Sequence, residues 1–436
     1  MASDEHHLME ETARLAQHPV SRATFLKLAT AAGATSLLGA MGCGGDSSPS
    51  TTGAGAAAGG KSIQRGVLTN QVTTLSNNYF VEWTDGVKQL ARGLGVELHT
   101  VTHEGNVSTQ LAQVGDVKNS GGKMLFGAVA TQGVLPAVAR ACQNAQIYYS
   151  NLFDLPAWFT PPDVGDYYVA FYVQQSELVA HDMATRLFEE MGGRGTFIHV
   201  PGIPGASADD QRTAGVLRAM ERFPEIERFA SAPGNWNQTD GRRAFADAIQ
   251  ARPDYTGVFA QNDAMIVGIQ SVLAERGVSG KPIVGIDGDK QNIGYIRDGR
   301  QLATAATISG WDAALAAVAV FDALNGWKPQ MCERMMFIPS VYVDGRNADD
   351  YFEAFMAKPE LPFEWEQMSR ALHPSDWNIQ ADVTPIDPRE FWKGIPQKDF
   401  QLNADYAKAL DAGELDRVRA LYAQHYVDGP FKAFGA

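Results

Sequence analysis

The sequence lacks the residue patterns of several common protein classes. It holds three cysteines in 436 residues, Cys43, Cys142 and Cys332, which are too few for a disulfide framework in a chain of this size. It has no HExxH, Gx4GK[ST], GxSxG or paired CxxC motif, and its histidines are scattered. We therefore expect no metal, no cofactor and no nucleophilic active site, and packing rather than cross-links must stabilise the fold.

Positive charge is also scarce. The chain has 36 Lys and Arg against 50 Asp and Glu, a formal net charge of −14. Residues 1–42 carry three basic and four acidic residues, so the remainder carries −13. An acidic chain is repelled by phosphate backbones and anionic lipid surfaces. Nucleic-acid binding is excluded on this ground, and contact with a membrane would need an anchor.

The N-terminal segment lacks an apolar run long enough to span a bilayer. Residues 28–42 are small and apolar, but this stretch is about fifteen residues against the roughly 20 that a permanent span needs. It follows SRATFLK (21–27), which resembles a twin-arginine signal in which Ala23 replaces the second arginine. We predict a cleaved export signal, with the twin-arginine and general secretory routes both open.

An anchor follows this signal in the sequence. LLGAMGC (37–43) resembles a bacterial lipobox ending at Cys43, although Ala40 replaces the usual leucine. It predicts lipid attachment at Cys43; the alternative is cleavage nearby that leaves this cysteine in the discarded peptide or free at the terminus. Residues 44–62 are almost wholly Gly, Ser, Thr and Ala, a composition that cannot bury enough apolar surface to fold, and they predict a flexible linker.

The body alternates short apolar segments with amphipathic ones. Helical periodicity occurs at 81–95, 176–193 and 264–278, several of these segments ending in glycine. Strands are predicted between the helices, at 96–102, 123–130, 146–152, 195–202, 256–263 and 282–289. This alternation predicts an α/β protein with parallel sheets covered by helices on both faces. The count of units before residue 165 and after 190 predicts two similar doubly wound lobes.

Polar residues follow the predicted strands. Asn151, Asn262 and Asp287 stand at or just after strand ends, where ligands bind in open parallel sheets. Two such lobes facing each other would form a polar cleft. The alternative is that these side chains only cap the following helices.

Four segments carry a family likeness, in order and at matching spacing. They are residues 74–95, 202–215, 258–268 and 284–300. Residues 65–343 resemble the periplasmic sugar-binding proteins of the ribose-binding type, a type I periplasmic binding fold. The resemblance implies a hinge between an N-terminal lobe (63–170 plus about 309–336) and a C-terminal lobe (about 171–308 plus 337–343), with 344–436 as an extension of unknown role.

The resemblance also implies a set of ligand contacts. Arg212 and Asp287 would form charge-assisted hydrogen bonds to neighbouring hydroxyls, and aromatic rings would hold the ligand's plane. Each has a plainer interpretation: packing for the aromatic pair, a surface ion pair with Asp209 for Arg212, and a helix cap for Asp287. The full set is Asn77, Tyr79, Phe80 and Asn151 on the first lobe, Arg212, Trp236, Asn262 and Asp287 on the second, and Thr307 at the hinge.

The sequence departs from the ribose type at three places. Asn151-Leu152 stands where the family has an Asp-Arg pair, Gly127 replaces a polar residue, and Thr307 replaces a glutamine. A Pro-rich insertion at 153–165 brings Trp158 and Phe159, which we expect near the cleft mouth as a lid. Fewer charged contacts predict a small sugar or sugar alcohol other than ribose.

The implied function is that of an exported solute-binding protein. It would deliver its ligand to the membrane permease of an ABC transporter, acting as a monomer at the outer face of the cytoplasmic membrane or in the periplasm. A sugar-sensing receptor component shares the same pattern, and a secreted sugar-modifying enzyme using Asp263, Asp287 or Asp289 is the rival from another class. In the extension, Trp365, Trp377 and Trp392 predict packing against another surface, and 404–426 predicts a helix capped by Asn403 or Asp405.

Overall fold

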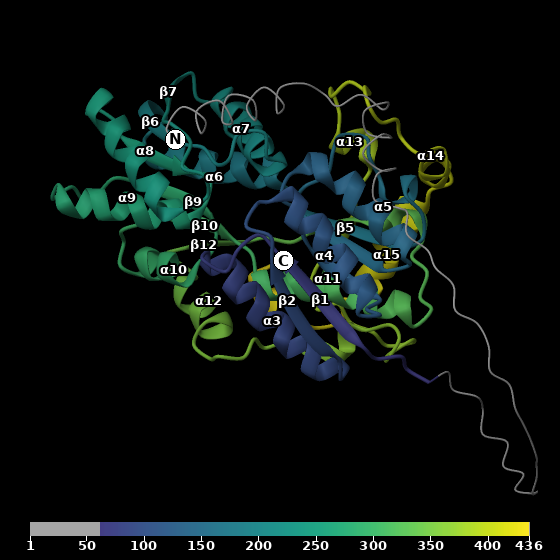
Figure 1. Cartoon of the computed structure of the whole chain (residues 1–436). Coiled ribbons are helices and arrows are strands. Elements are labelled where there is room, and N and C mark those ends of the chain that lie inside the picture. Colours follow the sequence, from purple (N-terminus) through teal and green to yellow (C-terminus); the bar gives the residue numbers. More distant parts are fainter. Residues whose placement is uncertain (1–61, 436) are drawn as a thin grey trace, which may run out of the picture. The chain divides into compact units, whose positions relative to one another are not determined.

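The structure is a computed structural model that describes residues 62–435. The predicted export signal, Cys43 and nearly all of the linker lie outside the described residues. The elements fall into two parallel sheets with flanking helices, which confirms the predicted pair of α/β lobes (Figure 1).

The first lobe is built on a seven-stranded sheet in the order β13-β11-β5-β4-β3-β1-β2. All neighbours are parallel except β11 and β13. Strands β3 and β5 are buried along their whole length, as expected for a parallel sheet covered on both faces. The strands are β1 (Val67–Val72), β2 (Glu97–Thr102), β3 (Met124–Ala128), β4 (Tyr148–Leu152), β5 (Tyr168–Gln174), β11 (Met335–Ile338) and β13 (Thr384–Pro385).

The second lobe has a six-stranded sheet in the order β12-β10-β9-β8-β6-β7, antiparallel only between β10 and β12. Its core forms two apolar clusters, one on either side of the sheet. The strands are β6 (Arg194–Val200), β7 (Glu225–Ala230), β8 (Gly257–Ala260), β9 (Ile283–Asp287), β10 (Ala303–Ala306) and β12 (Val341–Asp344).

Helices cover both sheets. The first lobe carries α3 (Asn78–Leu94), α4 (Val107–Asn119), α5 (Leu135–Ala145) and α11 (Ser309–Leu324), with short 3-10 turns at Gln132–Val134 and Pro161–Asp163. The second lobe carries α6 (Ser176–Glu190), α7 (Ser207–Met220), α8 (Gln238–Ala251), α9 (Asp263–Glu275), α10 (Lys290–Arg297) and α12 (Ala348–Phe355).

The chain passes between the sheets after Gln174, after Ala306 and after Ile338. The predicted lobe boundaries near 170, 308 and 336 lie within four residues of these crossings. A fourth crossing follows α12. Lys290 of α10 donates to the carbonyl of Met356 at 2.8 Å, whereas the amide of Leu361 donates to Gln89 of α3 at 2.9 Å. Residues 356–361 therefore run from the second lobe to the first.

Beyond residue 361 the extension packs on the first lobe. Its elements are 3-10 turns at Trp365–Met368 and Pro430–Phe434, α13 (Pro388–Phe391), α14 (Ala404–Asp411) and α15 (Glu414–Gln424). Helices α14 and α15 contact the 3-10 turn at Met331–Arg334, and Phe391 of α13 contacts Phe337 of β11. Trp377 and Trp392 are buried in the same apolar cluster as the first-lobe core, while Trp365 is partly buried against it. The prediction that these tryptophans pack against a surface is confirmed.

Helix α11 forms part of the first-lobe surface that the extension covers. Fifteen of its sixteen residues are buried, because the sheet covers one face while α3 and the extension cover the rest. Its Asp322 accepts hydrogen bonds from the Ser369 hydroxyl and from the amides of Arg370 and Ala371. The extension thus supplies the partners that a carboxylate in an apolar helix needs.

The single helix predicted for 404–426 was wrong. Gly413 adopts φ 70°, a left-handed conformation that ends α14 and precedes α15. The predicted N-terminal cap is confirmed. The Asn403 side chain accepts hydrogen bonds from the backbone amides of Asp405 and Tyr406 at the start of α14. Cys142 and Cys332 are both buried and unpaired.

Candidate functional site

Two buried charges lie at the strand ends of the second lobe. Arg212 extends from the buried face of α7, and Asp287 ends β9; a guanidinium nitrogen lies 3.7 Å from the Asp287 carboxylate. Asp287 adopts φ 118°, a conformation that favours glycine and persists in other residues only where the surroundings hold it. In this conformation its carboxyl group lies beside Arg212.

Arg212 is held by further contacts. It donates to the carbonyl of Gln261 at 2.5 Å and to the side chain of Gln174, at the end of β5 in the first lobe, at 3.2 Å. Burial lowers the pKa of the guanidinium, while the carboxyl group of Asp287 acts in the opposite direction. The side chain therefore links the lobes where the chain first crosses between them.

Trp236 completes the second-lobe side. Its ring lies 5.4 Å from the guanidinium carbon of Arg212, within cation–π distance. Asn262 caps α9 through the amide of Met265 and donates to the Trp236 carbonyl. Gly202 is required next to this ring, because a Cβ there would lie 2.0 Å from it.

Tyr79 faces the cleft from the first lobe. Its hydroxyl donates to Asp312, in the first turn of α11, at 3.1 Å. Burial raises its pKa well above the usual value, and the carboxyl groups of Asp312 and Asp287 add to the rise. Phe80 packs edge-on against Tyr79 and in a tilted arrangement against Trp83. Asn77 caps α3 through the amide of Tyr79, so its side-chain oxygen is already engaged.

Burial shifts the carboxyl groups of this region upward. It raises the pKa of Asp312 to about 8, partly offset by the hydrogen bond from Tyr79. It raises the pKa of Asp287 to about 6, against the opposing effects of Arg212 and of a hydrogen bond from Asn262. At neutral pH the site therefore holds both a protonated acid that can donate and a carboxylate that can accept.

Asp263 has a different role. Burial raises its pKa to about 7, and Asp287 adds to the rise. Its two oxygens accept from the amides of Gly288 and Asp289 and from the side chains of Thr304 and Gln301. These contacts fix the turn that follows Asp287. All of them come from its own lobe, so Asp263 supports the site and leaves no oxygen free for a substrate.

Three buried polar atoms of the cleft have no hydrogen-bond partner among residues 62–435. They are Nε of Arg212, Oγ1 of Thr307 and Oδ1 of Asp312. A buried donor or acceptor without a partner costs about 1–3 kcal/mol. The side chains of Thr307 and Asp312 interact with each other, and this interaction lowers the pKa of Asp312. Nε of Arg212 is therefore the buried donor that a ligand hydroxyl would satisfy.

The lobes also touch at the N-terminus of α7. Gln132 donates to the carbonyl of Gly205 and accepts from the Ser207 hydroxyl, and Asp154 accepts from the Ser207 amide at 3.2 Å. The cap residue of α7, Ala206, has no side-chain acceptor. Asp154, from the first lobe, takes the place of that cap.

The structure brings together most of the predicted site and separates the rest. Tyr79, Arg212, Trp236, Asn262, Asp287 and Thr307 are joined by the contacts and electrostatic effects above. The Asn151 amide is engaged within its own lobe, accepting from the Tyr168 hydroxyl and donating to the Asp154 carbonyl.

The lid expected from Trp158 and Phe159 needs correction. The Trp158 indole donates to the carbonyl of Ile395 at 2.9 Å, and its ring lies 5.5 Å from that of Trp392. Phe159 is fully buried against Tyr168 and Phe400. The extension covers both rings, so they belong to its interface with the first lobe.

Sequence reasoning missed Asp312, Gln174 and Asp154. Asp312 had a usable signal, because it is one of two acids in the otherwise apolar stretch 309–323 and lies five residues after Thr307. A carboxyl group in such a stretch needs a partner or a proton. Gln174 and Asp154 act through contacts with the other lobe, which sequence periodicity does not report.

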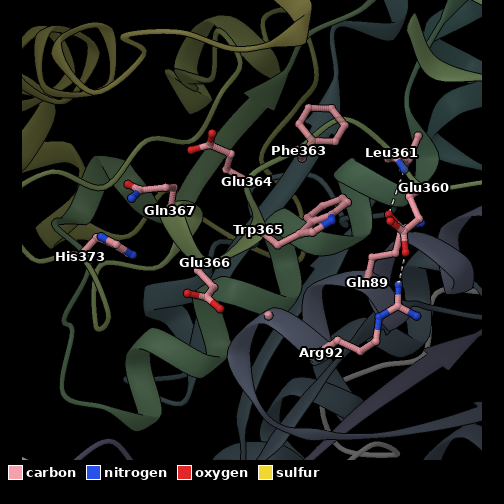
Figure 2. Close-up of a pocket in the computed structure, with 11 residues that line it drawn as sticks. Gln89, Arg92, Glu360, Leu361, Phe363, Glu364, Trp365, Glu366, Gln367 and His373 are labelled. Atoms are coloured by element: carbon pink, nitrogen blue, oxygen red, sulfur yellow. Dashed lines mark hydrogen bonds and ion pairs between the residues drawn. The ribbon is translucent and has the colours of Figure 1, made fainter. Parts of the chain in front are cut away.

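One groove lies away from this cleft. It has a volume of about 490 Å³ and runs between α3 and the extension, and Figure 2 shows Trp365, Glu366 and Arg92 along it. Its dashed contacts join Gln89 to Leu361 and Arg92 to Glu360. It lacks the buried unpartnered atoms of the cleft, so we assign it no role in binding.

The described residues hold neither a metal-binding cluster nor a membrane-spanning helix. Within residues 62–435, no group of three His, Cys, Asp or Glu side chains is arranged to hold a metal ion. Over the same residues, no helix is both long and apolar enough to cross a membrane.

Comparisons with known proteins agree with the fold. Residues 71–328 match the family model described as a periplasmic binding protein domain. The chain is 28% identical over 238 residues to the ribose import binding protein RbsB of Escherichia coli, covering 54% of this chain and 77% of that one. It is 26% identical over 271 residues to the xylitol-binding protein of Mycolicibacterium smegmatis, covering 62% and 75%.

Solved structures give the same result. A twin-arginine translocation pathway signal protein from Burkholderia phytofirmans superposes with a TM-score of 0.63 at 23% identity, covering 69% of this chain and 94% of that one. An ABC transporter periplasmic solute-binding protein from Actinobacillus succinogenes, with bound D-allose, has a TM-score of 0.61 at 21% identity and covers 66% and 100%. About a third of this chain has no counterpart in either structure.

Proposed function

We propose, from the premise that this chain belongs to the periplasmic binding protein domain family, that it captures a small sugar or sugar alcohol between its two lobes and delivers it to the permease of an ABC transporter. The observation that carries the proposal is the buried pair of Arg212 and Asp287. Buried polar atoms of the cleft without a partner support it further, and the Tyr79 hydroxyl lies on the opposite lobe.

The chemistry of the cleft suits a neutral polyol. A sugar hydroxyl both donates and accepts, so it can pair with the Arg212 donors and with the Asp287 carboxylate. Protonated Asp312 donates as well as accepts at neutral pH, because burial raises its pKa to about 8. The Trp236 ring offers an apolar face for the C–H side of a sugar. The curated relatives, named for ribose, allose, apiose and xylitol, support the same class.

The division of contacts between lobes supports capture by closure. Tyr79 belongs to the first lobe, whereas Arg212, Trp236 and Asp287 belong to the second, so a ligand completes its bonds only when the lobes meet. A ligand that binds the closed state more tightly shifts the population toward it. The closed form presents both lobe surfaces to a permease at once, and the names of the import binding relatives support that partner.

The first experiment is a melting-temperature panel. A ligand that binds only the folded state stabilises it by about 2.7 kcal/mol at a concentration of 100 Kd. At least one monosaccharide or alditol should raise the melting temperature of the protein by several degrees. A flat response to every sugar, with a clear response to an amino acid or a nucleoside, would contradict the proposed ligand class.

Export and anchoring remain predictions about residues outside the described part of the chain. If Cys43 carries lipid, the protein made in its native host should fractionate with membranes, and Cys43→Ser should release it or stop its processing. Equal release of both forms would count against the anchor. A single acyl chain binds only marginally, so the attachment is expected to carry more than one.

A further inference from the structure

A second cavity adjoins the cleft on its hinge side. Its volume is about 160 Å³, and it lies where α3, the first turn of α11 and the fourth crossing meet. Its lining includes Glu82 and Gly86 of α3, Thr307 and Ser309 of the hinge, and Tyr351 and Leu361 of the extension. The outer wall is therefore built by residues beyond 328, where the match to the family model ends.

This hinge-side cavity shares a lining residue with the candidate sugar site. Thr307 lines the cavity and is also a predicted ligand contact. Glu82 lies three residues after Tyr79, so both face the same side of α3. Burial raises the pKa of Tyr351 well above the usual value, and the carboxyl groups of Glu82 and Asp312 add to the rise. Tyr351 therefore lies near both regions.

Two hydroxyls in the cavity have no partner among residues 62–435. They are Oγ of Ser309, which is 3% exposed, and Oη of Tyr351, which is fully buried. Packing explains the Tyr351 ring, because it lies 5.1 Å from the ring of Phe355 and 5.7 Å from that of Phe434. It does not explain the hydroxyl, since phenylalanine would pack equally well without burying an unpaired polar group.

The size of the cavity limits its occupant. At about 30 Å³ for each water molecule in the liquid, the space matches about five waters. That volume accommodates a unit of about three hydroxylated carbons. Hydroxyl partners suit such a unit, because each of its own hydroxyls both donates and accepts.

We propose that this hinge-side cavity is a subsite for a short polyol unit, so that the ligand is a sugar carrying about three further hydroxylated carbons. This inference rests on the proposed function and narrows its ligand class. The extension then has a binding role: it contributes the Tyr351 hydroxyl and closes the far end of the ligand site.

The test compares a sugar with its glyceryl glycoside. The monosaccharide that raises the melting temperature most is titrated calorimetrically, and so is the same sugar bearing a glyceryl group. The proteins are wild type, Tyr351→Phe, Ser309→Ala and the control Tyr342→Phe. Tyr342 is a suitable control because its hydroxyl also comes from a tyrosine near a lobe crossing. It is partly exposed and donates to Asp182 instead of lining the cavity.

We expect the glyceryl glycoside to bind wild type at least tenfold more tightly than the parent sugar. Tyr351→Phe and Ser309→Ala should each reduce that preference about three- to tenfold, the loss of one neutral hydrogen bond, while affinity for the parent sugar stays unchanged. Tyr342→Phe should retain the full preference. Melting temperatures without ligand identify a variant that has lost its fold, and the other variant then carries the test.

Two results overturn the inference in different ways. If wild type binds the parent sugar as tightly as the glycoside, or if Tyr351→Phe and Ser309→Ala keep the preference, the subsite is wrong and the proposed function stands. If neither compound binds for any sugar in the panel, the proposed function fails and the subsite fails with it.

Discussion

Replacement of Arg212 by alanine should weaken ligand binding far more than replacement of any exposed arginine. The side chain donates to Gln261 at 2.5 Å and to Gln174 at 3.2 Å, and it lies 3.7 Å from Asp287. Its Nε has no partner within the described chain, so we assign that donor to the ligand. Alanine removes the donor and also leaves the Asp287 carboxyl group buried without its cation.

The magnitude follows from these contacts. A hydrogen bond to a charged group contributes about 1.5–3 kcal/mol, and a stranded buried partner adds to the loss. We expect a change of about 2–4 kcal/mol, or roughly 30- to 1,000-fold in Kd. Loss of Arg212 should also raise the pKa of Asp287 above about 6, because the guanidinium is the main influence that lowers it. The variant should therefore bind more weakly still at lower pH.

The matched control is Arg218→Ala on the same helix. Arg218 pairs with Glu177 at 2.5 Å, but both side chains are over 40% exposed, and such pairs contribute little. Calorimetric titration of the sugar identified in the melting panel should give the control a Kd within about twofold of wild type. A ligand that binds Arg212→Ala as tightly as wild type, in a variant that still melts cooperatively, would refute the assignment of this residue.

Three further predictions concern pH, packing and closure. Burial raises the folded-state pKa of Asp312 to about 8, so the folded chain keeps a proton that the unfolded chain releases above about pH 4. As the pH rises from 4 to 8, the free energy of unfolding of wild type should therefore fall relative to that of Asp312→Asn by up to about 1.4 kcal/mol per pH unit. Urea unfolding measured across this range checks the prediction, and the same pH dependence in both proteins would contradict it. Gly202→Ala should weaken sugar binding about as much as Trp236→Ala, because the new Cβ displaces the Trp236 ring. The control Gly294→Ala places its Cβ within 4 Å of no atom and should leave the calorimetric Kd unchanged. Equal affinities of the three variants would contradict this prediction. Asp154→Ala should remove the cap of α7 and raise the Kd for the sugar about fivefold, which corresponds to about 1 kcal/mol. An unchanged Kd in the titration would contradict this prediction.

The fold was largely predictable because local patterns determine its elements. Alternating apolar strands and glycine-ended helices predicted both lobes, and each of the six predicted strands overlaps an observed one. Strand β13 could not be predicted, since it has two residues and exists only through its pairing with β11. The lid was wrong for a similar reason: Trp158 and Phe159 pack against residues more than 200 positions later in the chain.

The candidate site was predictable where the resemblance supplied residue identities. It gave Arg212, Trp236 and Asp287, which the structure brings together. It did not give Asp312, since the last ligand contact that the resemblance implied is Thr307 and the proton on a buried acid depends on three-dimensional surroundings. It also missed the cap that Asp154 provides to α7, because that contact joins the two lobes.

The central claim, that the cleft holds a neutral polyhydroxylated ligand, is tested most directly by native mass spectrometry of the protein purified from its own host. The account predicts an adduct that is released on denaturation, has the mass of a sugar or polyol, and is absent from Arg212→Ala. Release of an amino acid, a nucleoside or a peptide from the wild-type protein, or an adduct retained in full by Arg212→Ala, would contradict it.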